Sequence, residues 1–159
     1  SLLLLGRLDE GLAVCDEALK IRSDRGYLWF LKGYCKYKGE KWEETLKFFD
    51  LAYRNGITNS LEYSTLCLLE LKRNSQCIEV ATKGIQRHPE FASLYFTRGL
   101  ARKYLKQPMD LVCADMKRAA ELKPSLMSSY QRNCSGERAN RCLIVTPIKL
   151  VFASSLTKR

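Results

Sequence analysis

Small residues recur along the chain at a nearly constant spacing. Ala18, Ala52, Gly84 and Ala119 lie 34, 32 and 35 residues apart, and apolar residues stand three and six positions before each of them. Residues at such intervals share one face of an α-helix. The pattern therefore predicts repeated copies of one helix, each approaching its neighbours closely at the small residue. A period of this length is typical of helical repeat arrays.

A partner helix precedes three of these copies. Gly33, Thr65 and Gly99 each lie four residues after a large apolar residue, which is a second repeated mark. Short turns such as YKGEKW and KQPMD join the two helices of a pair, so we expect antiparallel neighbours. The predicted helices cover residues 1–5 (the end of a first helix), 8–21, 26–38, 42–54, 60–72, 75–87, 91–105 and 109–122.

These helices form one predicted domain, residues 1–130. Its units lie at about 1–25, 26–57, 58–91 and 92–124, followed by a capping helix at 125–132 that carries Leu126, Met127 and Tyr130. Such units stack because one helix pair cannot bury its apolar face alone. The first unit starts inside a helix, so we expect a segment upstream of Ser1.

The composition changes near Gln131, where the repeat stops. The last 29 residues hold six basic residues and one acidic residue, Glu137. Their apolar stretch CLIVTPIKLVF (142–152) is interrupted by Pro147 and has no second strand to pair with. We predict that residues 133–159 are a basic tail, disordered or loosely docked. Our hypothesis for its origin is an alternative transcript end.

Two strings resemble the tetratricopeptide repeat (TPR) family: GRLDEGLAVCDEALKI near the start and ADMKRAAELKP before Pro124. The resemblance extends over about Leu2 to Pro124, or about three and a half repeats. It implies an all-α fold, an α-α superhelix that is a right-handed solenoid of antiparallel helix pairs. It also implies a concave groove, built by the first helix of each pair, that binds a peptide or helix of another protein. Such arrays are typically scaffolds or adaptors and not enzymes.

The same resemblance indicates which residues line the groove, namely those one turn either side of Gly33, Thr65 and Gly99. Aromatic rings there would be favoured anchors for a bound segment, because they bury much area at little entropic cost. The alternative is that many of these rings pack inside the array. The predicted groove residues are Phe30, Tyr34, Tyr37, Lys38, Glu62, Leu69, Phe96, Lys103 and Tyr104.

Charge leaves several classes of partner open. The chain has 27 Lys and Arg against 17 Asp and Glu, a net charge of +10, which favours acidic peptides, nucleic acid or anionic membrane surfaces without choosing among them. The segment RNGITNSLEYSTLCLLELKRN, Arg54 to Asn74, resembles a junction between pentatricopeptide units, which read single-stranded RNA. That resemblance involves one junction only. A protein partner is therefore the main hypothesis, and single-stranded RNA the alternative.

The remaining chemistry-bearing residues predict no catalytic or metal site and no cofactor. The seven cysteines include no C-x-x-C pair, and His88 is the only histidine, so neither a zinc site nor a disulfide framework is indicated. Reduced thiols in the core are the simplest interpretation. They favour the cytoplasm, with the nucleus as the alternative. No apolar run is long enough for a membrane span.

Overall fold

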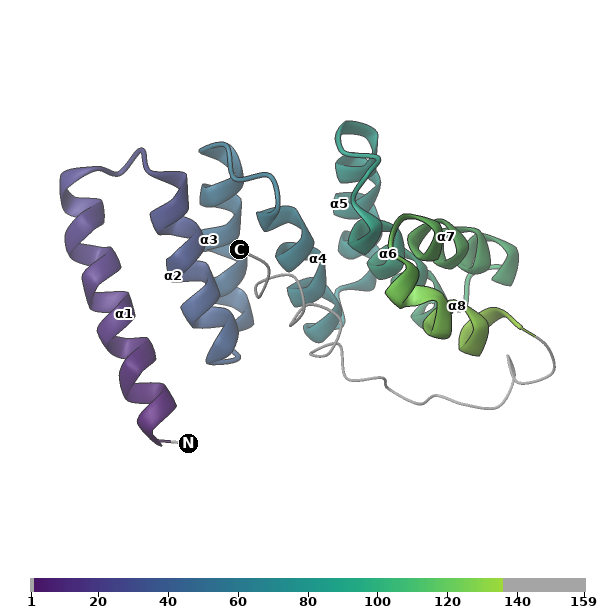
Figure 1. Cartoon of the computed structure of the whole chain (residues 1–159), viewed down its shortest axis with the longest axis horizontal. Coiled ribbons are helices and arrows are strands. Elements are labelled where there is room, and N and C mark those ends of the chain that lie inside the picture. The colour runs from purple at the N-terminus through teal and green to yellow at the C-terminus, as the bar shows by residue number, and fades with distance from the viewer. Residues whose placement is uncertain (1, 136–159) are drawn as a thin grey trace.

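The computed structural model describes residues 2–135, with side chains from Gly6 onward, and this part of the chain is built from helices (Figure 1). The elements are α1 (Leu2–Ile21), α2 (Gly26–Lys38), α3 (Trp42–Arg54), α4 (Ser60–Glu70), α5 (Asn74–Arg87), α6 (Ala92–Tyr104), α7 (Met109–Leu122), the 3₁₀ turn η1 (Pro124–Leu126) and α8 (Met127–Cys134). No strand occurs among the described residues. The predicted all-α fold class is therefore confirmed.

Consecutive helices pack side by side along the molecule (Figure 1). α2 packs on α3, α4 on α5 and α6 on α7, while α3–α4 and α5–α6 contacts join one pair to the next. The first helices of the pairs also meet, since α4 contacts α6 and aromatic rings of α2 contact α4. We call the side formed by α2, α4 and α6 the inner face.

The helix boundaries follow the predicted pattern with one error. α2, α3 and α7 have the predicted bounds, and α4, α5 and α6 differ by one or two residues. The predicted break between residues 5 and 8 is wrong, because α1 is continuous from Leu2 to Ile21. Gly6 weakens a helix by about 1 kcal/mol at most, and the leucines around it favour the helix.

The turns inside the three complete pairs share one backbone conformation. Glu40, Lys72 and Lys106 have φ angles of 58°, 57° and 54°. After the first of them, Lys41 N–H donates to the Lys36 carbonyl at 3.0 Å, and the other two turns repeat this bond. This is the Schellman helix end, in which glycine is usual at the positive-φ position. Because charged residues occupy that position here, the sequence did not reveal the motif.

Close helix contact explains two of the recurring small residues. A Cβ atom on Gly33 would lie 2.8 Å from the Phe49 ring, and one on Gly84 would lie 2.8 Å from Leu94 Cδ1. Both distances are well below the roughly 3.5 Å of favourable carbon–carbon contact. The predicted role of small residues in helix packing is confirmed at these two positions.

A disulfide bond corrects the prediction that the cysteines are reduced. Cys113 of α7 is bonded to Cys134 at the end of α8, with their Cα atoms 5.6 Å apart. The sequence did not predict this pair because 21 residues separate the two cysteines and α8 was not expected to reach residue 134. The free cysteines of the described chain are Cys15, Cys35, Cys67 and Cys77.

η1 and α8 cover the last helix pair. Leu126 is 3% exposed and packs in one cluster with Phe96 and Met116, and Tyr130 packs against the same cluster. These contacts are those predicted for the capping helix. Met127 was expected to join them but is 41% exposed. Most of the predicted basic tail, including Cys142, lies outside the described residues.

Candidate interaction surface

An aromatic cluster joins α2 to α4 on the inner face. Tyr63 of α4 is 6% exposed, and its ring centroid lies 6.1 Å from that of Tyr34 and 5.7 Å from that of Tyr37, with the rings edge to face. Phe30 contacts the same tyrosine at 5.5 Å. Such edge contacts are favourable between aromatic rings. They hold the two α2 tyrosines in place while part of each ring stays exposed.

Glu70, the last residue of α4, lies next to this cluster. Burial raises the pKa of Tyr104, and the negative charge of Glu70 raises it further. Burial also raises the pKa of Tyr37, with Glu70 again among the charged neighbours. One carboxylate therefore lies near tyrosines of both α2 and α6. Glu70 is exposed and forms no ion pair with any described residue.

The structure divides the predicted groove residues by exposure. Phe30, Leu69 and Phe96 are buried at 8%, 5% and 4% exposure and have little surface left for a partner. They face inward because each first helix must also bury a stripe against its own second helix. The other predicted residues keep accessible surface: Tyr34, Tyr37, Glu62 and Lys103 are partly buried, and Lys38 and Tyr104 are exposed.

Both predicted groove lysines have partners within the protein. Lys38 Nζ lies 5.3 Å from the ring centroid of Tyr34, which is a cation–π contact. Lys103 Nζ donates a hydrogen bond to Asn133 Oδ1 at 2.7 Å. The second contact also brings the end of α8 beside α6. Neither contact is an ion pair, so Lys38, Lys103 and Glu70 all lack an ion-pair partner among the described residues.

A second acidic group lies near the start of α4. Glu62 lines a cavity of about 240 Å³ together with Glu90, Phe91 and Lys123. Burial raises the pKa of the Glu62 carboxyl, and this effect is opposed by a hydrogen bond that Ser93 Oγ donates to it and by the charge of Lys123. Glu62 is eight residues from Glu70, a rise of about 12 Å along an α-helix.

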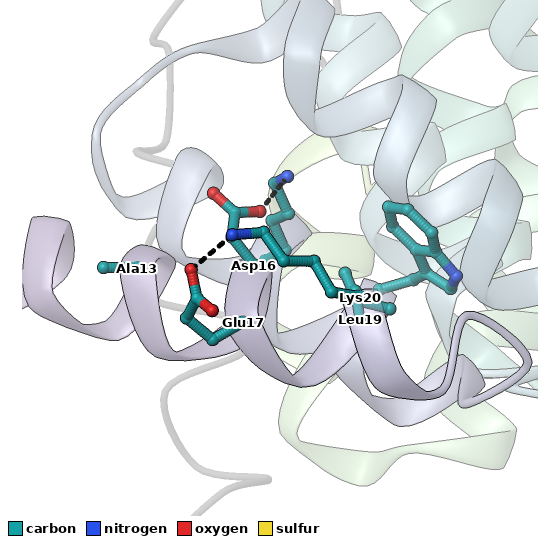
Figure 2. Close-up of a pocket in the computed structure, with 7 residues that line it drawn as sticks. Ala13, Asp16, Glu17, Leu19 and Lys20 are labelled. Atoms are coloured by element: carbon teal, nitrogen blue, oxygen red, sulfur yellow. Dashed lines mark hydrogen bonds and ion pairs between the residues drawn. The ribbon is translucent and has the colours of Figure 1, made fainter.

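A larger cavity of about 660 Å³ lies between α1 and α2 (Figure 2). Its ionic groups are already paired: Lys32 donates to Asp16, and Lys20 Nζ lies 2.6 Å from Glu17 Oε1. Lys32 Nζ also lies 4.6 Å from the centroid of the Phe48 ring. Because these charges satisfy one another, we consider this cavity a weaker candidate than the inner face. Its lining residues are Ala13, Asp16, Glu17, Leu19, Lys20, Trp29 and Lys32.

A buried ion cluster, which the sequence reading missed, fixes α6 to α7. Asp115 is 4% exposed and accepts hydrogen bonds from Arg98 Nε at 2.9 Å and Nη2 at 2.6 Å, and from Arg102 Nη1 at 2.8 Å. The sequence does contain a signal for this cluster. Two arginines lie four residues apart on α6, and one acidic residue lies inside the apolar stripe of α7. The cluster sets the position of α6, which carries Tyr104.

The described residues contain no other obvious chemical site. No group of three or more His, Cys, Asp and Glu side chains within them is placed to hold a metal ion, and a structural zinc site needs four such ligands. No helix between residues 2 and 135 is long and apolar enough to cross a membrane. The inner face is therefore the strongest candidate for an interaction surface.

The fold resembles solved TPR structures. No protein-family model matches the sequence, and no curated protein matches it either. MamA from Desulfovibrio magneticus RS-1 (residue 41 to the end) has a TM-score of 0.70 at 18% identity, over 80% of this chain and 72% of that one. The TPR domain of Arabidopsis OM64 has a TM-score of 0.62 at 22% identity, over 69% and 93%. YrrB, described as a TPR protein with an unusual peptide-binding site, has a TM-score of 0.62 at 16% identity, over 82% and 72%.

Proposed function

We propose that this chain, which has a TPR-like helical repeat fold, is a protein-interaction scaffold that binds an extended or helical segment of another protein on its inner face. The observation that carries the proposal is a set of three partly accessible tyrosines. Tyr34 stacks on Tyr37, and Tyr37 and Tyr104 both lie near the exposed carboxylate of Glu70. Rings beside one carboxylate offer both apolar contact area and a polar group that can orient a bound segment.

The packing of the tyrosines supports this role. Tyr37 lies edge to face against Trp42, with ring centroids 5.3 Å apart, and stacks on Tyr34 at 6.4 Å. Because their neighbours already restrict these rings, a partner that binds them pays little additional rotamer entropy. Rigid aromatic residues of this kind are favoured anchors in protein interfaces.

The test replaces one accessible ring on α2 and one on α6. The Tyr34→Ala, Tyr104→Ala double variant should weaken capture of partner proteins from cell lysate by about thirtyfold if each ring contributes about 1 kcal/mol. Leu111→Ala is the matched control. Leu111 is 41% exposed, close to the 39% of Tyr104, but it lies on α7 and not on a helix of the inner face.

Partners would be identified by mass spectrometry, and thermal melting would confirm that each variant folds. Ribonuclease treatment of the lysate separates a protein partner from an RNA-bridged one. Capture by the double variant at the level of the Leu111→Ala control would refute the proposal, because the rings would then contribute nothing to binding.

A further inference from the structure

The short helix α8 packs on α7 with few contacts to hold it (Figure 1). It has eight residues, and none of them is buried. An isolated helix of this length is barely stable in water, so α8 depends on its attachments to the rest of the fold. At its start, the η1 residue Leu126 is 3% exposed and packs with Phe96. Its last turn has no such buried anchor.

Two contacts attach the last turn of α8, and they involve adjacent residues. Cys134 is bonded to Cys113 of α7, and Asn133 Oδ1 accepts a hydrogen bond from Lys103 Nζ of α6 at 2.7 Å. One hydrogen bond offsets roughly the entropic cost of ordering a single residue. The hydrogen bond between Lys103 and Asn133 therefore depends on the disulfide, which keeps the Asn133 amide close to α6.

The bonded cysteines differ in accessibility from two others of the described chain. Cys113 and Cys134 are only partly buried. Burial raises the pKa of the Cys67 and Cys77 thiols to about 12, which keeps them protonated and unreactive. Of these four cysteines, the bonded pair is therefore the one that a dissolved thiol can reach.

We propose that the Cys113–Cys134 disulfide is a redox latch for the inner face. When oxidised, it holds Asn133 on Lys103. When reduced, it releases the last turn of α8 and leaves the Lys103 ammonium free for an acidic group of the partner. Lys103 precedes Tyr104 directly in α6, so the freed charge lies beside one of the proposed anchor rings. This regulation of binding rests on the proposed function, whereas the latch itself does not.

The chemical step is thiol–disulfide exchange with a small thiol of the glutathione class. The thiolate of a first small molecule attacks one sulfur of the bond, forms a mixed disulfide and releases the other cysteine as a thiolate. A second small thiolate attacks the mixed disulfide and releases the remaining cysteine. Both cysteine thiolates take up protons from water. Two electrons thereby pass to the protein, and the small thiols leave as one disulfide molecule.

Acetylation of lysines by acetic anhydride, followed by mass spectrometry of the full chain, tests the latch. The protein is equilibrated with oxidised or with reduced glutathione before labelling. Lys103 should be acetylated about fivefold faster in the reduced chain, the effect of losing one hydrogen bond. Lys36 is the matched control, because it is also partly buried and its Nζ lies 2.7 Å from Glu44 Oε2, but it is on α2. Its rate should not change.

Two variants separate the hydrogen bond from the disulfide. Asn133→Ala should raise the acetylation rate of Lys103 in the oxidised chain to that of the reduced chain, and reduction should then add nothing. The Cys113→Ser, Cys134→Ser double variant should show the fast rate with either form of glutathione. Thermal melting confirms that both variants fold.

Three results would overturn the inference. The first is one acetylation rate for Lys103 in the oxidised and reduced chains. The second is an equal acceleration at Lys36, since reduction would then loosen the whole fold. The third is a map of the oxidised chain in which Cys113 and Cys134 are free or bonded to Cys142. If Lys103 responds as expected while the Tyr34→Ala, Tyr104→Ala variant captures as well as its control, the latch stands and the proposed function fails. If Lys103 does not respond while that variant loses capture, the latch fails and the proposed function stands.

Discussion

Replacing Asp115 by Ala should be the most damaging single change outside the apolar core. The side chains of Asp115, Arg98 and Arg102 are 5%, 14% and 18% exposed. Asp115→Ala removes three charge-assisted hydrogen bonds at once. It also leaves two guanidinium groups largely shielded from water, without their carboxylate.

The expected loss in free energy of unfolding is about 3 kcal/mol. Removing one partner of a buried ion pair costs about 3–5 kcal/mol. The lower end applies here because both arginine side chains keep a small exposed fraction through which water can reach them. A sum over the three hydrogen bonds would overestimate the loss, since bonds to one carboxylate are not independent.

Urea unfolding followed by circular dichroism measures this loss. Glu79→Ala is the control, because its ion pair with Lys83 joins side chains that are 63% and 71% exposed. Water screens such an exposed pair, so its loss should change the free energy of unfolding little. A loss for Asp115→Ala below about 1 kcal/mol, or one equal to that of Glu79→Ala, would contradict the assignment of Asp115 as the centre of a shielded cluster.

Two further predictions concern the capping helix and the acidic cavity. Cys113→Ser should lower the free energy of unfolding by about 3 kcal/mol, because it opens a loop of this length. A reductant should lower the free energy of unfolding of the original chain but not that of the variant. A melting curve of the original chain that does not change in reductant would contradict this prediction. Because the folded pKa of Glu62 is raised above its ordinary 4.5, the folded state keeps this proton longer than the unfolded state. The free energy of unfolding of the original chain should therefore fall, relative to that of Glu62→Gln, as pH rises from about 4.5 through the folded pKa. If the two proteins show the same dependence of this free energy on pH, the prediction is wrong.

Much of the fold followed from local pattern. The recurring small residues and the apolar stripes predicted the helix pairs, and the bounds of α2, α3 and α7 needed no revision. Gly33 and Gly84 stand where a Cβ atom would meet Phe49 and Leu94. Their role could be predicted because close helix packing requires a small residue at every repeat.

The candidate surface was only partly predictable. Tyr34, Tyr37 and Tyr104 keep accessible surface, whereas Phe30 and Phe96, predicted by the same rule, are buried. A shift of one residue rotates a side chain by about 100° around the helix. Sequence spacing therefore identifies the inner helices more reliably than the side of each helix that faces a partner.

The amino-acid sequence by itself determined a helical repeat, because its period and apolar stripes act within single helices and between adjacent ones. Only the tertiary structure decided which side chains meet across helices. It joined Cys113 to Cys134, gathered Arg98 and Arg102 around Asp115, and left Glu70 without an ion pair among the described residues. Each of these depends on the rotation and separation of packed helices, which no local pattern specifies.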